Sequence, residues 1–363
     1  MHNNFNRLNN YLISAGILLA TAFMFSSCSV DDNSTGGKDT PSPYDCLSPI
    51  GFGENTTGGN NQNISVVSTA TELAEAVSGT DPSTIYVKGD IMLDKLVSVG
   101  SNKSIIGLPG ASVNNLNRDE NAGIFLLKRS NNVIIRNLIL RGPGAYDIDA
   151  NYGDNITVED SKNVWVDHCD IQDGIDGNFD IVSGSDSICV SWCRFRYLID
   201  PKGGGSGGYD DHRLSNLIGN EDTSADIDEG HLNVTFICCW WGDGCVEYSP
   251  RVRFGKVHLV NCLYDGNDYN YCIGYGVFSN IYVENCAFTS DAAQTNVLKD
   301  LHNDKDFNVK VVGCLGTDDI ELSEGSREQF VPTYDYDAFN SNIVSYVLKD
   351  VNSGAGPTLN IKP

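Results

Sequence analysis

The chain has 363 residues, 37 of them glycines, and a formal net charge of −24 at pH 7. This length allows two average domains or one elongated repeat fold. The glycines, with 40% hydrophobic and only 20% charged residues, favour β structure with many turns and a sizeable core over a helical bundle. So acidic a chain excludes a generic nucleic-acid-binding protein, and it repels any polyanion unless local arginines or a bound divalent cation bridge the two.

The first 45 residues predict a leader and a linker. The apolar run Leu12 to Phe25 suits the hydrophobic region of a signal peptide and is too short to span a bilayer. It ends in MFSSC, which resembles the cleavage and acylation site of a bacterial lipoprotein, so we predict a signal peptide over 1–27 and a lipid anchor at Cys28. A plain secretory peptide is the alternative. Residues 28–45 are polar and rich in Gly, Ser, Asp and Pro, as in a tether.

The location of the mature protein follows from the start of this tether. An acidic pair just after the cysteine resembles the surface-export signal of lipoproteins in Bacteroidetes-type bacteria. We therefore expect a lipoprotein on the surface of the outer membrane, or a secreted protein if the anchor is absent. The membrane would be contacted only through the lipid on Cys28.

The folded region is expected to begin with a short capping helix. The segment TATELAEAV, 69–77, has helical spacing of its apolar positions, with Thr71 as the expected N-cap and Glu72 in the first turn. Residues 83–93 and 103–113 then alternate in the manner of β-strands interrupted by glycine.

A nine-residue strand pattern then repeats at intervals of about 21 to 31 residues. Its copies begin at Asn132, Asn163, Ser187, His212, Asn233, Lys256, Asn280 and Asn308. One apolar strand per cycle is what a stack of coils requires, because each coil contacts only its neighbours. We therefore predict an all-β fold for residues 46–363, a right-handed single-stranded parallel β-helix.

The cysteines support the same stacking. In every copy but that of His212, the seventh position holds, in order, Leu138, Cys169, Cys193, Cys239, Cys262, Cys286 and Cys314. Twelve cysteines in an exported chain could instead form a disulfide framework. Adjacent parallel strands, however, hold Cα atoms about 4.8 Å apart with parallel Cβ vectors, which is poor disulfide geometry. We predict a reduced, inward-pointing ladder, with one or two disulfides open elsewhere, for instance at Cys46, Cys245 or Cys272.

Three carboxylates are candidates for a metal site. Asp154 precedes Asp176 by about one coil, and Asp180 follows across a tight turn. Carboxylates that converge in this way repel one another unless a hard cation such as calcium lies among them. The alternative is that Asp176 and Asp180 form the turn and that Asp154 is a solvated cap. The spacing alone does not decide between the two.

Two arginines lie on an extended segment about two coils further on. Alternation would send the side chains of Arg251 and Arg253 the same way, where a guanidinium can hold a carboxylate in a bidentate manner. Either could instead be a buried ion-pair partner of the acidic body. His168 and His258 occupy different positions of the repeat, so we do not expect them to share a metal.

Four motifs together resemble the pectate lyase family, polysaccharide lyase family 1: SNKSIIG at 101–107, WVDHCDI at 165–171, SPRVRFGKVHLVN at 249–261 and GFGENTTGG at 51–59. The resemblance covers nearly all of residues 46–356. It implies a β-helix that cleaves de-esterified homogalacturonan by calcium-assisted β-elimination. In that family calcium bridges enzyme carboxylates and a substrate uronate, and an arginine removes the C5 proton to leave a 4,5-unsaturated end.

The resemblance also assigns roles. It implies that Asp154, Asp176 and Asp180 are the calcium ligands and that Arg253 is the second arginine of the family's R-x-P-x-x-R motif. Arg213 lies near the position of a lysine that binds the substrate carboxylate and could replace it.

The chain departs from the family at two positions. Tyr248 stands where the catalytic arginine is expected, and Tyr152 stands where a further aspartate is expected. A tyrosine acts as a base only as phenolate, so its ordinary pKa of about 10 would have to be lowered by Arg251, Arg253 or the cation.

These observations lead to three hypotheses. The first is a calcium-dependent pectate lyase, with Tyr248 or a neighbouring arginine as base and with Arg253 and Arg213 binding polygalacturonate or pectin. The second is a catalytically impaired relative that binds homogalacturonan. The third is a β-helix hydrolase of the polygalacturonase kind, which would need paired catalytic aspartates and not the PRVRFG segment. We expect a monomer with calcium as its cofactor and no nucleic-acid partner.

Overall fold

The computed structural model describes residues 47–146, 152–205, 208, 210–301, 306–317 and 326–363. The predicted signal peptide 1–27 and tether 28–45, including Cys28, lie outside the described residues, as does Cys46. The described residues belong to one compact unit. No helix in the described ranges combines the length and apolar character of a membrane span.

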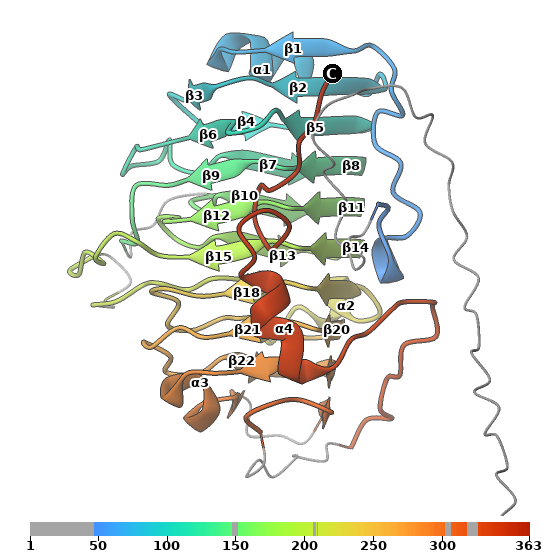
Figure 1. Ribbon diagram of the computed structural model, residues 1–363, viewed down its shortest axis with the longest axis vertical. Helices are drawn as coiled ribbons and strands as arrows, with labels where there is room; N and C mark the ends of the chain where they lie inside the picture. Colours follow the sequence, from blue (N-terminus) through green and yellow to red (C-terminus); the bar gives the residue numbers. More distant parts are fainter. Residues whose placement is uncertain (1–46, 147–151, 206–207, 209, 302–305, 318–325) are drawn as a thin grey trace, which may run out of the picture. The chain divides into compact units, whose positions relative to one another are not determined.

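Three parallel sheets run along this unit, and the chain visits them in rotation (Figure 1). Sheet 1 contains β1 (Ser65–Val67), β2 (Ser83–Val87), β5 (Lys103–Gly107), β8 (Asn131–Arg136), β11 (Lys162–Asp167), β14 (Asp186–Ser191), β17 (Val234–Ile237), β20 (Lys256–Val260), β23 (Asn280–Glu284) and β26 (Asn308–Val312). Sheet 2 contains β3 (Asp90–Met92), β6 (Ser112–Asn114), β9 (Ile139–Arg141), β12 (Asp170–Gln172), β15 (Arg194–Arg196), β18 (Trp240–Trp241), β21 (Leu263–Tyr264) and β24 (Ala287–Phe288). Sheet 3 contains β4 (Val97–Ser98), β7 (Phe125–Lys128), β10 (Ile156–Glu159), β13 (Phe179–Val182), β16 (Leu217–Ile218), β19 (Arg251–Val252), β22 (Ile273–Tyr275) and β25 (Leu298–Asp300). This is the predicted right-handed parallel β-helix.

Short helices lie at the ends and edges of the coils. They are the 3₁₀ helix η1 (Gly51–Gly53) and the α-helices α1 (Ala70–Ala76), α2 (Ala225–Asp228), α3 (Asp291–Thr295) and α4 (Ser341–Leu348). The predicted first helix is confirmed, but its cap is not Thr71. Thr69 accepts a hydrogen bond from the backbone N–H of Glu72, whose side chain accepts one from the backbone of Thr69. This capping box starts the helix two residues earlier than the apolar pattern predicts.

The segment at His212 is not a copy of the sheet 1 strand. In sheet 1, β14 pairs directly with β17, and Leu217 and Ile218 belong to sheet 3. One long coil therefore runs from Ser187 to Asn233. The apolar residues of both strand types alternate in the same way, so the pattern alone did not separate them.

The cysteine ladder is confirmed. Each ladder residue follows one whose backbone is left-handed, and these preceding residues are Asn137, His168, Trp192, Cys238, Asn261, Asn285 and Gly313, with φ between 47° and 65°. The repeated conformation turns the chain sharply from sheet 1 to sheet 2. Among residues with a side chain, asparagine tolerates it well, and the amide of Asn261 also donates to the carbonyl of Asn285 in the next coil at 3.0 Å.

The side chains after these turns point into the core. Leu138 and the ladder cysteines from Cys169 to Cys286 belong to the hydrophobic core, and Cys314 packs against it. The six ladder cysteines are free thiols, and so are Cys245 and Cys272, for which a disulfide was left open. Their spacing explains this, since stacked parallel strands do not offer disulfide geometry.

We expect the ladder thiols to be inert in the folded protein and reactive in denaturant. Burial raises the pKa of Cys193, Cys262 and Cys286 well above its ordinary value, so almost no thiolate forms near neutral pH. The measurement is alkylation without a reductant, native and in denaturant, with peptide mapping by mass spectrometry. A disulfide between any two ladder positions would contradict the stacking.

Candidate active site

The candidate site lies on the outward face of sheet 3. Thr157 pairs with Asp180, and Leu217 pairs with Arg251, which in turn pairs with Gly274. Ile181 and Ile218, which pair with each other, belong to the core, so their preceding neighbours Asp180 and Leu217 face outward in adjacent strands. Asp180 and Arg251 therefore share one outward row, separated by two strand spacings, about 10 Å between Cα atoms.

Asp154 lies opposite Gly177 and not opposite Asp176. The backbone N–H of Asn155 donates to the carbonyl of Gly177 at 3.2 Å, which shifts the expected stacking by one residue. A Cβ atom on Gly177 would lie 2.5 Å from Oδ1 of Asp154 and 3.2 Å from Oδ1 of Asp180. The glycine thus leaves room for two carboxylates to approach each other.

Asp154 is buried and incompletely satisfied, and Asp180 beside it is half-buried. Oδ2 of Asp154 accepts a hydrogen bond from Oγ1 of Thr157 at 3.1 Å, while Oδ1 has no partner among the described residues. Oδ1 of Asp180 accepts one from the backbone N–H of Leu217 at 3.0 Å. Burial raises the pKa of Asp180 to about 8. Burial, and then the charges of Asp180 and Asp176, raise the pKa of Asp154 well above its ordinary value.

This donor set fits a hard divalent cation, which would neutralise the buried charge and take the orphaned oxygen as a ligand. Across the described residues, however, no group of three or more His, Cys, Asp or Glu side chains is already arranged to hold a metal ion. Asp176 is one reason that the three aspartates do not form such a group, because its Oδ1 lies 2.9 Å from Nε2 of His212. The structure therefore brings Asp154 and Asp180 together, with Asp176 beside them and bound to a histidine.

Tyr248 and Arg251 form a pair two strands away from Asp180. Nη1 of Arg251 donates to the hydroxyl of Tyr248 at 2.6 Å, and the guanidinium lies over the tyrosine ring, 5.2 Å from its centre. Nε of Arg251 is buried without a partner in the described structure. Burial raises the pKa of Tyr248 and outweighs the opposing effects of Arg251 and Arg253. The two arginines therefore do not bring the phenol toward a neutral pKa.

The other two arginines are held by carboxylates of the chain itself. Arg253 is only 8% exposed, and it donates from Nε to Oδ1 of Asp222 at 2.7 Å and from Nη1 to the carbonyl of Gly219 at 2.9 Å. Arg213 binds Asp211 through Nε and Nη2, at 2.8 and 2.7 Å, and Asp268 through Nη1 at 3.0 Å.

Tyr152, His168 and His258 lie outside this row, and each contacts another side chain. The hydroxyl of Tyr152, at the expected aspartate position, is 2.6 Å from Nζ of Lys128. Nδ1 of His168 contacts Asp167 at 2.8 Å, and Nδ1 of His258 contacts the hydroxyl of Tyr334 at 2.8 Å.

Sequence reasoning missed several residues of the site. His212 was assigned to a copy of the strand pattern and given no role in the site, and neither Asp222 nor Gly177 was singled out. The run DDHR, with a histidine among aspartates, was a weak signal for His212.

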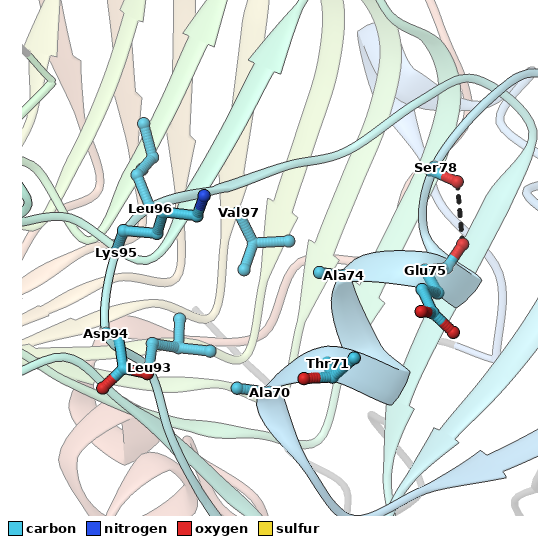
Figure 2. Close-up of a pocket in the computed structure, with 10 residues that line it drawn as sticks. All are labelled: Ala70, Thr71, Ala74, Glu75, Ser78, Leu93, Asp94, Lys95, Leu96 and Val97. Atoms are coloured by element: carbon cyan, nitrogen blue, oxygen red, sulfur yellow. Dashed lines mark hydrogen bonds between the residues drawn. The ribbon is translucent and has the colours of Figure 1, made fainter.

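A separate pocket of about 450 Å³ lies between α1 and the segment 93–97 (Figure 2). In Figure 2, Leu93 and Val97 face Ala70 and Ala74 across it. Its lining includes none of the candidate residues described above, and it forms no part of this site.

We expect the metal-free protein to lose stability as the pH rises. The folded pKa of Asp180 is about 8, against about 3.9 in an unfolded chain. The folded state therefore binds more protons between these values, and the free energy of unfolding falls from about pH 4 through about pH 8. Urea unfolding in chelator at several pH values measures this slope. Asp180→Asn should flatten it, and calcium should restore stability most at the upper end.

A wild-type slope equal to that of Asp180→Asn would contradict the assignment of uncompensated charge to this carboxylate.

Comparisons with known proteins identify the family of the chain. A family model described as pectate lyase matches residues 51–358. Pectate lyase plyB of Emericella nidulans is 34% identical over 227 residues, which cover 60% of this chain and 61% of that protein. Pectate lyase A of Aspergillus niger is 36% identical over 217 residues, 58% of this chain and 59% of the relative. The chain thus spans about three fifths of the length of the curated relatives it matches.

Solved structures show the same fold. A thermostable pectate lyase superposes with a TM-score of 0.68 at 23% identity, covering 86% of this chain and 98% of the other. A pectate lyase bound to a hexasaccharide gives a TM-score of 0.66 at 22% identity, over 86% of this chain and 98% of that one. With the family model matching most of the sequence, the chain belongs to the pectate lyase family, polysaccharide lyase family 1.

Proposed function

We propose that the protein is a calcium-dependent pectate lyase that cleaves de-esterified homogalacturonan by β-elimination. The observation that carries this proposal is the outward row of sheet 3, where Asp180, with Asp154 beside it, lies two strands from Arg251. A polyuronate approaching a chain of formal net charge −24 needs local positive charge. Asp154 and Asp180 can bind a cation that supplies this positive charge, and the guanidinium of Arg251 is itself positively charged.

Asp154 and Asp180 would hold the calcium ion, and Asp176 would join them on leaving His212. When bound, calcium would bridge these carboxylates to the uronate and acidify its C5 proton. The cradle at Gly177 keeps the two protein carboxylates close enough to share one ion.

Tyr248 is the proposed base, and Arg251 is the group that supports it. As phenolate, the Tyr248 oxygen takes the C5 proton. The C–H electron pair forms the C4–C5 double bond, and the C4–O bond breaks with its electrons on the leaving oxygen, which takes a proton from solvent. The hydrogen bond from Nη1 of Arg251 stabilises the phenolate once it forms.

The Nε of Arg251 is buried and unpartnered in the described structure, and it would donate to the uronate carboxylate once the guanidinium turns toward the substrate. Arg253 and Arg213 are proposed as further uronate ligands, and each would exchange a carboxylate of the chain for one of the substrate.

The proposed setting is extracellular. Cleavage after residue 27 and acylation of Cys28 would leave residues 28–45 as a tether and 46–363 as the β-helix, displayed by a monomer on the outer membrane surface. Secretion without an anchor is the other outcome, and mass spectrometry of the mature N-terminus distinguishes them.

The direct test is incubation with polygalacturonate, with calcium and then with chelator. We expect ultraviolet absorbance from unsaturated uronides in calcium only. New reducing ends without that absorbance would indicate a hydrolase. Binding without any product would indicate a protein that only binds homogalacturonan.

Substitution of Tyr248 tests the base. Since the phenolate is the active form and burial raises its pKa, kcat/KM should rise about tenfold per pH unit up to and beyond pH 10. Tyr248→Phe should lower kcat by about 10²-fold or more, while Tyr248→Arg should change the pH profile.

Tyr271→Phe is the matched control. Its ring lies 6.3 Å from that of Tyr248, and its hydroxyl has no partner in the described structure, so activity should be retained. If Tyr248→Phe is as active as the wild type, the base is elsewhere and Arg251 is the next candidate.

A further inference from the structure

One turn of the β-helix is much longer than its equivalents. Residues 160 and 161 connect β10 to β11, and residues 253–255 connect β19 to β20, whereas residues 219–233 connect β16 to β17. We call residues 219–233 the acidic loop. It contains no lysine or arginine, and its acidic residues are Glu221, Asp222, Asp226, Asp228 and Glu229.

The acidic loop is held at several points. Nδ2 of Asn220 donates to the hydroxyl of Ser183 at 3.0 Å, and Glu229 forms an ion pair with Arg327 at 3.4 Å. Asp228, at the end of α2 (Figure 1), is fully buried, and its Oδ1 accepts a hydrogen bond from the backbone N–H of Gly184 at 2.7 Å. Asp222 lies earlier in the loop, where its side chain is 45% exposed and bonds Nε of Arg253 at 2.7 Å. The loop can therefore stay attached through Asp228 while Asp222 moves.

Arg253 is a proposed ligand of the substrate uronate, and Asp222 presents it with the same chemical group. A carboxylate on a guanidinium nitrogen is the contact that a galacturonate unit would make there. The remaining contact, from Nη1 to the carbonyl of Gly219, also comes from the acidic loop.

We propose that Asp222 is an internal competitor of the substrate, so that a polyuronate reaches Arg253 only by displacing this carboxylate. The inference rests on the proposed function, because it assumes that the ligand is a uronate. It adds that the acidic loop sets the affinity of the site. A sugar that binds weakly or carries no charge cannot displace Asp222. A polyanion bound at several points can, because its contacts elsewhere in the site favour the exchange.

The test compares two variants that remove the same charge from the same loop. Asp222→Asn removes the competitor. Asp226→Asn is the control, because Asp226 is also exposed and the hydrogen bonds of Arg253 in the described structure go to Asp222 and Gly219. The readout is the affinity for trigalacturonate in calcium, measured by calorimetry, which does not require turnover. We expect Asp222→Asn to bind about three- to tenfold more tightly and Asp226→Asn to change by less than about twofold in 0.15 M salt.

Arg253→Ala separates competition from a general charge effect. In that background, Asp222→Asn should no longer raise the affinity, because the contested guanidinium is gone. Thermal unfolding confirms that each variant is folded, and Arg253→Lys replaces Arg253→Ala if the latter is not.

Each outcome decides the inference separately from the proposed function. Weaker binding by Asp222→Asn would mean that Asp222 positions Arg253, and would overturn competition, as would equal gains in both loop variants. Tighter binding by Asp222→Asn in a protein that makes no unsaturated product would support competition while the lyase activity fails. If neither the wild type nor Asp222→Asn binds trigalacturonate, competition is also wrong.

Discussion

The in-register stacking of parallel strands is the constraint on which the rest of this structure depends. Each coil adds one strand spacing of about 4.8 Å, so residues far apart in the sequence become neighbours along a row. In this way Asp180 and Arg251 come to lie in one row of sheet 3, two strands apart. The same stacking buries the ladder from Leu138 to Cys286 inside the coils. A shift of one residue has chemical consequences, because placing Asp154 over Gly177 opens the space that two carboxylates share.

Charge is the second constraint, and it acts on function more than on fold. The chain carries a formal net charge of −24, and its proposed ligand is a polyanion. Two of the candidate site's arginines, Arg213 and Arg253, are already bound by the chain's own carboxylates. On the proposed function, binding would exchange one carboxylate for another at these two arginines. A divalent cation held by Asp154 and Asp180 would favour that exchange by adding positive charge where burial has left negative charge uncompensated.

Much of the fold could be predicted from the sequence, because the apolar strand pattern and the cysteines both recur once per coil. The right-handed β-helix, the first helix and the inward ladder are confirmed. The His212 segment was misplaced because strands of sheets 1 and 3 have the same alternation. The cap at Thr69 was missed by two residues because periodicity does not locate the first unpaired N–H groups.

Less of the candidate site could be predicted. Motifs pointed to Asp154, Asp176 and Asp180, and to the segment of Tyr248 and Arg251, because these are local in sequence. The contacts between His212 and Asp176 and between Asp222 and Arg253 join residues about 30 or more positions apart. They depend on the length and path of one unusual coil, which no local pattern encodes. The raised pKa of Tyr248 depends likewise on burial, which the sequence does not show.

The central claim is that carboxylates of the chain and of the substrate share one calcium ion. It is tested most directly by calorimetry of calcium binding with and without trigalacturonate, for the wild type and for Asp180→Ala. The account predicts that calcium binds more tightly when the oligosaccharide is present, because each ligand completes the site of the other. It also predicts that Asp180→Ala abolishes this coupling. Equal calcium affinity with and without trigalacturonate, or identical binding by the wild type and Asp180→Ala, would contradict it.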